Sequence, residues 1–267
     1  MFCFKNQELL PFFIKNDTLN STNKGVKMTR PSGRAADELR PIEIQTHVNK
    51  YAPGSCLIKW GDTHVLCTAM IEDKVPAWMK QQQKHGGWLT AEYGMLPHAG
   101  NIRKDRDAVK GKQDSRAIEI QRLIGRSLRA IIDLHQIPNK TIKIDCDVLQ
   151  ADGGTRTASI TAAYIAVKMA IDDALKTGRI EHTPLIGQVA AVSCGIVGSE
   201  PVLDLDYAED SNAGTDANFV MTDSDKLIEI QGSAEGAPFS KDEFSTLLTL
   251  AEKGIRELIQ KQNEALK

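Results

Sequence analysis

From residue 39 onward, apolar and polar positions follow two periodicities, one typical of strands and one typical of helices. Alternation at every second residue in 42–45 and 55–60 predicts strands, and the turn Gly61-Asp62-Thr63 before a further strand predicts a β-hairpin. Apolar residues spaced three and four apart predict helices. In this part of the chain the predicted strands are 42–45, 55–60, 64–70 and 141–148, and the predicted helices are 117–134 and 158–175.

The same succession, strands and then a helix, returns after residue 187. Here the predicted strands are 188–197, 201–207, 216–222 and 227–232, and a helix is predicted at 241–261. Because groups of strands followed by helices are typical of α+β folds, we expect two α+β halves packed together. They span 28–176 and 188–267, with the boundary within 177–187.

The first 27 residues differ from the rest of the chain. Their apolar opening is interrupted by Lys5, Glu8 and Pro11, and a polar stretch occupies 15–24. A signal peptide needs a positively charged start and an uninterrupted apolar centre, and this segment has neither. Met28 is a more natural beginning, so we expect 1–27 to be a disordered extension or the product of an upstream start codon.

Composition narrows the class of protein. The 267 residues are 41% hydrophobic and 25% charged, as in ordinary globular proteins, and the net charge of −2 means that nucleic-acid binding would need local basic patches. No apolar run approaches the roughly 18–20 residues that a membrane span needs. The five cysteines are scattered and form no CxxC pair, which indicates reduced, buried thiols in a cytoplasmic protein. The cysteines are Cys3, Cys56, Cys67, Cys146 and Cys194.

The segment Asp152-Gly-Gly-Thr-Arg-Thr157 leads directly into the predicted helix at 158–175. Two glycines let the backbone approach an anion, and a helix N-terminus offers unpaired N–H groups and a partial positive charge. Thr155 and Arg156 add a hydroxyl and a two-pronged guanidinium donor. Taken alone, the segment fits a phosphate cradle and a threonine-capped turn equally well.

An acidic segment follows the predicted strand 201–207. Asp204 and Asp206 are expected on one face of that strand, because side chains repeat every second residue. Asp210 and Asp216 flank a Ser-Asn-Ala-Gly-Thr turn that can bring them together as a hard-cation site, for which Mg²⁺ is the natural ion. The alternative is a solvated acidic hairpin without a metal.

Basic residues gather between residues 103 and 129. A Gly-containing loop carries five of them, and Arg122, Arg126 and Arg129 follow at a spacing that places them on one helix face. The five loop residues are Arg103, Lys104, Arg106, Lys110 and Lys112. A basic loop beside a basic helix face fits a phosphate backbone, and a solvated surface is the alternative. Arg116 stands apart, because it could reach an anion at the Gly154 turn and has only Glu119 as a local partner.

Four segments in register resemble the ribonuclease PH family. They are Gly-Gly-Trp-Leu-Thr-Ala-Glu-Tyr-Gly-Met-Leu-Pro at 86–97, Glu-Ile-Gln-Arg-Leu-Ile-Gly-Arg-Ser-Leu-Arg-Ala at 119–130, Gly-Thr-Arg at 154–156 and Leu-Asp-Leu-Asp-Tyr at 203–207. The resemblance implies a phosphorolytic exoribonuclease that trims the 3′ ends of transfer RNA precursors. It also implies a fold like ribosomal protein S5 domain 2, an assembly into homohexameric rings of dimers, and no DNA or membrane partner.

By this resemblance, one set of residues binds the attacking inorganic phosphate, a second holds Mg²⁺ and acts in catalysis, and a third contacts RNA. The phosphate set is Arg116, Gly154, Thr155 and Arg156; the metal and catalytic set is Asp210 and Asp216; the RNA set is Arg103, Arg106 and Arg122. The chain departs from the family pattern at His98-Ala99-Gly100, which removes one RNA-facing arginine. It departs again at Asp114-Ser115, where the usual glycine before Arg116 is absent.

Two other functions remain open from the sequence. A non-catalytic ring subunit of the same superfamily would be expected to lose the Gly-Thr-Arg turn or the aspartates, and both are present. A phosphate-binding enzyme of nucleotide metabolism would use the same cradle for a small molecule, and would need fewer cations than the basic loop and helix supply. Cleavage of a 3′-extended transfer RNA with and without phosphate discriminates between these functions and phosphorolysis.

Overall fold

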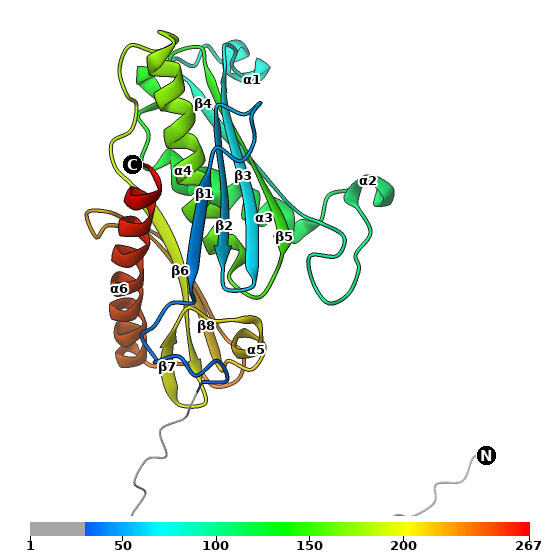
Figure 1. Ribbon diagram of the computed structural model, residues 1–267, viewed down its shortest axis with the longest axis vertical. Helices are drawn as coiled ribbons and strands as arrows, with labels where there is room; N and C mark the ends of the chain where they lie inside the picture. The colour runs from blue at the N-terminus through cyan, green and yellow to red at the C-terminus, as the bar shows by residue number, and fades with distance from the viewer. Residues whose placement is uncertain (1–29) are drawn as a thin grey trace, which may run out of the picture.

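The computed structural model describes residues 30–267, so the predicted extension at 1–27 and Cys3 lie outside the described residues. The described chain forms two β-sheets with helices packed against them (Figure 1). The α+β fold class expected from the sequence is confirmed. Within residues 30–267, no helix combines the length and apolar character needed to cross a bilayer.

The first sheet has five strands in the order β1-β2-β3-β5-β4. The strands are β1 (Ile42–Thr46), β2 (Gly54–Trp60), β3 (Thr63–Glu72), β4 (Trp88–Met95) and β5 (Thr141–Gln150). Neighbours are antiparallel except for β4 and β5, which are parallel. The sequence analysis assigned no strand to β4, although Leu89, Ala91 and Tyr93 alternate toward the core.

Helices of the first half are α1 (Ala77–Gln81), α2 (Asp107–Lys110), α3 (Ser115–Arg129) and α4 (Thr155–Lys176), with the short 3-10 helix η1 at Leu134–Gln136. The helix predicted at 117–134 is α3, shifted toward the N-terminus. It begins at Ser115 because the Asp114 side chain accepts a hydrogen bond from Arg116 N. It ends at Arg129 because the chain turns there toward a β-bridge between Ile132 and Leu185.

Helix α4 lies at the centre of the molecule. It packs against β2 and β3 of the first sheet and against β6 (Val189–Val197) of the second. Most of its residues from Thr157 to Ala174 are buried, on all sides of the helix. A helix that is apolar all round belongs in a core, so the start of α4 is held by both halves of the protein.

The second sheet has the antiparallel order β7-β6-β8-β9. Its other strands are β7 (Glu200–Leu203), β8 (Thr215–Thr222) and β9 (Leu227–Ala234). Two helices complete this half, α5 (Tyr207–Asp210) and α6 (Lys241–Ala265), and α6 runs along β6 (Figure 1).

The strand predicted at 201–207 is wrong beyond Leu203. Asp204 adopts a left-handed backbone conformation, with φ +58°, and Asp206 caps α5 through a hydrogen bond from Glu209 N. Asp204 and Asp206 therefore do not share a strand face. The alternation is overridden because the Asp204 carboxylate is buried in hydrogen bonds with Arg40 and Trp60.

The cysteines predicted to be reduced and buried are so wherever the structure describes them. Cys56, Cys67, Cys146 and Cys194 are free and buried. Burial raises the pKa of the Cys56 thiol to about 12 and also raises the pKa of Cys194. The thiols of Cys56 and Cys194 are therefore protonated at neutral pH and inert toward nucleophilic chemistry.

Candidate active site

The Asp152–Thr157 segment forms a left-handed turn that opens α4. Gly153 and Gly154 have φ values of +72° and +64°, which glycine adopts without strain. Gly154 is the N-cap residue, α4 begins at Thr155, and no side chain caps the helix. The threonine-capped turn considered from the sequence is therefore wrong. The first N–H groups of α4 are left without a side-chain acceptor, as an anion site requires.

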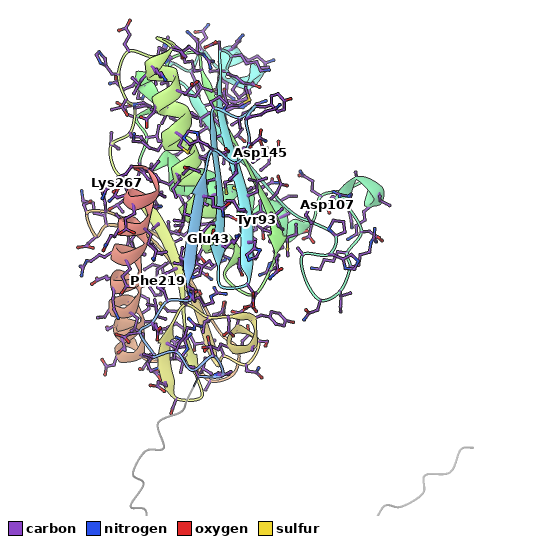
Figure 2. All side chains as sticks on the ribbon, viewed as in Figure 1. Glu43, Tyr93, Asp107, Asp145, Phe219 and Lys267 are labelled. Carbon is purple, nitrogen blue, oxygen red and sulfur yellow. The ribbon has the colours of Figure 1, made fainter. Side chains whose placement is uncertain are left out.

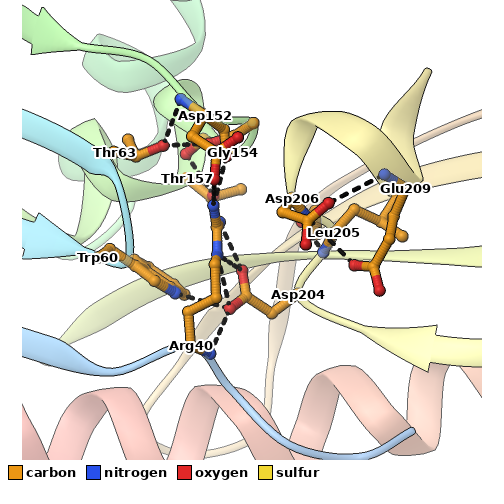
Figure 3. A network of polar contacts seen from close by, with 12 residues as sticks. Arg40, Trp60, Thr63, Asp152, Gly154, Thr157, Asp204, Leu205, Asp206 and Glu209 are labelled. Atoms are coloured by element: carbon orange, nitrogen blue, oxygen red, sulfur yellow. Dashed lines mark hydrogen bonds and ion pairs between the residues drawn. The ribbon is translucent and has the colours of Figure 1, made fainter. Parts of the chain in front are cut away.

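The side chains of Thr63, at the start of β3, and of Arg40, just before β1, hold this turn in place (Figure 3). Thr63 Oγ1 donates to the carbonyl of Gly153 at 2.6 Å and accepts from the backbone N–H of Asp152 at 2.9 Å. Arg40 donates a hydrogen bond from its guanidinium to the carbonyl of Asp152. Three backbone groups of the turn are thus fixed before any ligand binds, which is the preorganisation that anion binding needs.

Gly153 also brings the turn against the acidic segment of the second half. A Cβ atom at Gly153 would lie 2.8 Å from the carbonyl carbon of Asp206 and 2.9 Å from the carbonyl oxygen of Leu205. Only a residue without a side chain permits this approach. The Asp152–Thr157 turn and the segment that precedes Asp210 are therefore in direct backbone contact.

We expect Gly153→Ala to destabilise the protein by about 1–3 kcal/mol beyond the cost of positive φ alone, because the new methyl group overlaps that backbone. Gly178→Ala is the matched control, since Gly178 has φ +71° and nothing within 4 Å of its Cβ position. Urea unfolding of both variants measures the difference. Equal losses of stability would show that the backbone contact at Gly153 contributes nothing.

Thr155 and Arg156 extend from the first turn of α4 toward different partners. The Thr155 hydroxyl lies 2.9 Å from the hydroxyl of Tyr93, on β4. Burial raises the pKa of Tyr93, so its hydroxyl stays protonated and serves as a neutral hydrogen-bonding group. Arg156 donates to the Gln231 side chain and lies 3.7 Å from a carboxylate oxygen of Glu119.

Arg116, in the first turn of α3, opens onto a cavity of about 310 Å³ that Tyr93 also lines. Tyr93 connects this cavity to the start of α4, because it lines the cavity and its hydroxyl contacts that of Thr155. Glu119, the local partner that the sequence offered for Arg116, instead forms an ion pair with Arg156. Asp114, the residue that departs from the family pattern, accepts from Arg116 N at 2.8 Å and so stabilises the start of α3.

Asp210 is the last residue of α5, and Asp216 is the second residue of β8. Partial desolvation, and then the negative charge of Asp216, raise the pKa of Asp210, while Arg116, Arg156 and Arg40 act in the opposite direction. The two carboxylates therefore lie close enough to repel each other, within reach of the arginines that the sequence assigned to phosphate. The structure brings these predicted residues together.

These carboxylates suit a magnesium ion. Among residues 30–267, no group of three or more His, Cys, Asp or Glu side chains is arranged to hold a metal ion. Mg²⁺ is commonly bound by one or two carboxylates, with water and substrate phosphates completing six oxygen ligands. A pair of carboxylates near two arginines fits this preference, and a cation there would relieve the repulsion between Asp210 and Asp216.

The basic residues assigned to RNA are spread more widely. The loop before α3 projects from the body of the protein, with Asp107 of α2 near its tip (Figures 1 and 2). Arg106 lines the same cavity as Arg116, whereas Arg103 forms an ion pair with Asp105 at 2.7 Å. Arg122 is exposed on α3.

The basic helix face expected at Arg122, Arg126 and Arg129 is only partly available. Arg126 forms an ion pair with Glu229 of β9 at 2.7 Å. Arg129 lies over the ring of Trp88, 5.0 Å from its centre, and donates to the carbonyl of Leu89. Two of the three arginines therefore bind the protein itself.

A buried ionic network that was not predicted from the sequence lies beneath the turn (Figure 3). Asp204 is 1% exposed and accepts hydrogen bonds from Arg40, at 2.7 Å, and from the indole of Trp60, at 2.8 Å. Arg30 forms a two-pronged pair with Glu209 at 2.6 and 2.7 Å. The signal in the sequence was an aspartate inside an apolar strand pattern, since a buried carboxylate needs cationic partners.

The chain is similar to known proteins over most of its length. The 3′ exoribonuclease family matches in both of its parts, domain 1 over residues 38–171 and domain 2 over residues 187–254. The ribonuclease PH of Roseobacter denitrificans is 56% identical over 236 residues, covering 88% of this chain and 99% of that protein. The ribonuclease PH of Cereibacter sphaeroides is 57% identical over 237 residues, covering 89% and 99%.

Solved structures share the fold at lower identity. Rice Rrp46 matches with a TM-score of 0.70 and 20% identity, over 89% of this chain and 100% of its own. A chain of the Archaeoglobus fulgidus exosome, solved with RNA bound to its active site, matches with a TM-score of 0.71 and 24% identity, over 87% and 92%. With both family domains matched in order and relatives more than half identical along nearly their whole length, the chain belongs to the ribonuclease PH family of phosphorolytic 3′-to-5′ exoribonucleases.

Proposed function

We propose that the protein trims 3′-terminal nucleotides from transfer RNA precursors with inorganic phosphate bound at the start of α4, and releases nucleoside diphosphates. The observation that carries this proposal is the uncapped N-terminus of α4, formed by Gly154, Thr155 and Arg156. Tyr93 connects it to Arg116, because the Tyr93 hydroxyl contacts Thr155 and Tyr93 lines the same cavity as Arg116. A helix N-terminus with a hydroxyl and two guanidinium groups suits a doubly charged tetrahedral anion.

Phosphorolysis requires the attacking phosphate and the phosphodiester to be aligned more than it requires a general base. An oxygen of inorganic phosphate attacks the phosphorus of the terminal 3′,5′-phosphodiester, and the bond to the 3′ oxygen of the preceding nucleotide breaks. That oxygen leaves with a proton as the new 3′ hydroxyl, and the attacking phosphate becomes the β-phosphate of the diphosphate. Because the nucleophile is already an anion, Arg116 and Arg156 serve to offset the repulsion between two phosphates and to hold them in line. The reverse reaction adds nucleotides to RNA 3′ ends.

Asp210 and Asp216 would hold Mg²⁺, which supplies positive charge to the reacting phosphate oxygens when it is bound. The two aspartates would place that charge near the Asp152–Thr157 turn, because Gly153 packs against the segment that leads into α5. No other group in the site is needed to take up or release a proton before the attack.

RNA would enter past Arg106, which lines the same cavity as Arg116. Arg103, on the same projecting loop, and Arg122, on α3, would make further contacts with the RNA. Exosome chains of the same fold support RNA as the ligand, because one was solved with RNA in its active site. The proposed assembly is a homohexameric ring, a trimer of dimers in the cytoplasm. Light scattering after size-exclusion chromatography tests it, and a monomer at micromolar concentration would contradict it.

The direct experiment incubates the protein with a 3′-extended transfer RNA and Mg²⁺, with or without inorganic phosphate. We expect shortening only with phosphate, and nucleoside diphosphates as products. Shortening at equal rates without phosphate, with nucleoside monophosphates released, would mean hydrolysis. Binding of RNA without shortening under any condition would indicate the non-catalytic ring subunit instead.

Asp216→Asn is expected to raise the Mg²⁺ concentration for half-maximal phosphorolysis about tenfold or more, because one of the two anionic ligands becomes neutral. The measurement is the initial rate as a function of free Mg²⁺ at saturating phosphate. Asp225→Asn is the control, since Asp225 is an exposed aspartate paired with Arg256. An unchanged Mg²⁺ requirement in Asp216→Asn would remove Asp216 from the metal site.

A further inference from the structure

Gln231 is the point at which the second half of the protein touches the phosphate arginine. It lies on β9, and its side chain contacts residues of α3 and α4 in the first half. Its carbonyl oxygen accepts a hydrogen bond from the Arg156 guanidinium. Its amide nitrogen donates to a carboxylate oxygen of Glu119 at 2.9 Å. No role in the site has so far been given to this glutamine.

Glu119 fixes which end of the amide faces Arg156. A carboxylate only accepts hydrogen bonds, so the amide must present its NH₂ group to Glu119 and its oxygen to Arg156. Glu119 itself lies 3.7 Å from Arg156, beyond hydrogen-bond length, and its side chain is 54% exposed. The Arg156 guanidinium therefore makes its closest contact with the neutral amide of Gln231, although the carboxylate of Glu119 lies nearby.

A neutral acceptor suits an arginine that must bind an anion. A carboxylate in direct contact would neutralise the guanidinium and compete with phosphate for its donors. An amide oxygen occupies one donor, restricts the long side chain, and leaves the positive charge in place. Arg156 is 16% exposed, so its direction is set by these contacts and not by solvent.

We propose that Gln231 is a positioning residue for phosphate binding, which aims the Arg156 guanidinium at the start of α4 without neutralising it, with Glu119 orienting the glutamine amide. This inference rests on the proposed role of Arg156 in binding the attacking phosphate. It assigns to β9 a part in the reaction through Arg156, the residue of the Asp152–Thr157 turn that Gln231 contacts.

A neighbouring ion pair allows two effects to be distinguished: positioning of Arg156 by Gln231, and packing of β9 against α3. Glu229 lies two residues before Gln231 on β9 and forms a 2.7 Å ion pair with Arg126 of α3. This pair joins the same two elements and does not touch Arg156. Its loss weakens docking of β9 on α3 while the glutamine contact remains.

The decisive variant is Gln231→Glu, which keeps the size of the side chain and exchanges the neutral acceptor for a charged one. Phosphate must then displace a carboxylate from Arg156, so we expect the KM for phosphate to rise about tenfold, with kcat at saturating phosphate close to that of the wild type. In the reverse reaction the KM for a nucleoside diphosphate should rise in parallel. Gln231→Met, which removes the acceptor without adding charge, should raise the phosphate KM by about threefold.

Glu229→Gln is the matched control and should leave the phosphate KM unchanged. An unchanged phosphate KM in Gln231→Glu would overturn the inference, and so would an equal rise in Glu229→Gln, which would assign the effect to docking. If Gln231→Glu fails to fold, as judged by its melting temperature, the comparison of Gln231→Met with Glu229→Gln decides in the same way. Phosphate-independent shortening by the wild type would count against the proposed function itself and not against the role of Gln231.

Discussion

Replacing Arg156 with alanine is expected to lower kcat/KM for phosphate by about 10²–10³-fold, the usual cost of removing one preorganised donor to a reacting anion. Arg156 lies in the first turn of α4, beside the N–H groups that no side chain caps. Its loss removes a charged, two-pronged donor from the nucleophile and leaves the RNA-facing loop intact. The measurement is phosphorolysis of a 3′-extended transfer RNA across a phosphate titration, with RNA affinity determined separately by filter binding.

Two further variants make this result specific. Arg156→Lys keeps the charge but loses the planar fork, so its kcat/KM for phosphate should lie between those of the wild type and Arg156→Ala. Arg256→Ala removes one positive charge from an exposed pair with Asp225 and should leave the phosphate titration unchanged. Equal phosphate dependence in Arg156→Ala and the wild type would exclude Arg156 from the phosphate site, and weaker RNA binding alone would place it on the RNA path.

The parts of the site that the sequence could predict are those whose chemistry is local. The phosphate turn is a run of neighbouring residues, and its glycines adopt the positive φ values that such a turn requires. Asp210 and Asp216 are six positions apart, so a single turn brings them together. The long buried helix α4 was predicted within three residues of its start, because its apolar pattern is strong and glycines precede it.

The parts that the sequence could not predict depend on contacts between distant residues. Gln231 meets Arg156 across 75 positions and Glu119 across 112, and one polar residue on an edge strand has no periodic signal. Strand β4 gains its place by parallel pairing with β5, some fifty residues later in the chain. At Asp204 the local pattern was misleading, because alternation predicted a strand where a contact with Arg40, 164 positions away, bends the chain.

Asp204 carries the largest expected effect on stability. Its carboxylate is 1% exposed and accepts from the backbone and the guanidinium of Arg40 and from the indole of Trp60, at 2.7 to 2.8 Å in its shortest contacts. Arg40 is itself 6% exposed and donates to the phosphate turn at Asp152. Asp204 therefore supports, through Arg40, the turn that we propose to bind the attacking phosphate.

We expect Asp204→Asn to lower the free energy of unfolding by about 3–5 kcal/mol, because it leaves the buried Arg40 guanidinium with only the more distant, partly exposed carboxylate of Asp152, at 3.8 Å, as a counter-charge. Asparagine keeps the shape of the side chain and tolerates the positive φ at this position, so the loss reports charge and not backbone strain. The measurement is urea unfolding followed by circular dichroism, with the phosphate KM measured on the folded fraction.

Asp225→Asn is the matched control for this variant. Asp225 also has positive φ, at +57°, and also pairs with an arginine, Arg256, at 2.9 Å. Both partners of that pair are exposed, so its loss should cost about 0–1 kcal/mol. A loss in Asp204→Asn no larger than in Asp225→Asn would contradict the role of the buried pair. A large loss of unfolding free energy in Asp204→Asn, together with a raised phosphate KM in the folded enzyme, would show that the buried pair also maintains the geometry of the phosphate turn. Arg40 explains this link, because it binds Asp204 in the second half and the carbonyl of Asp152 in the turn.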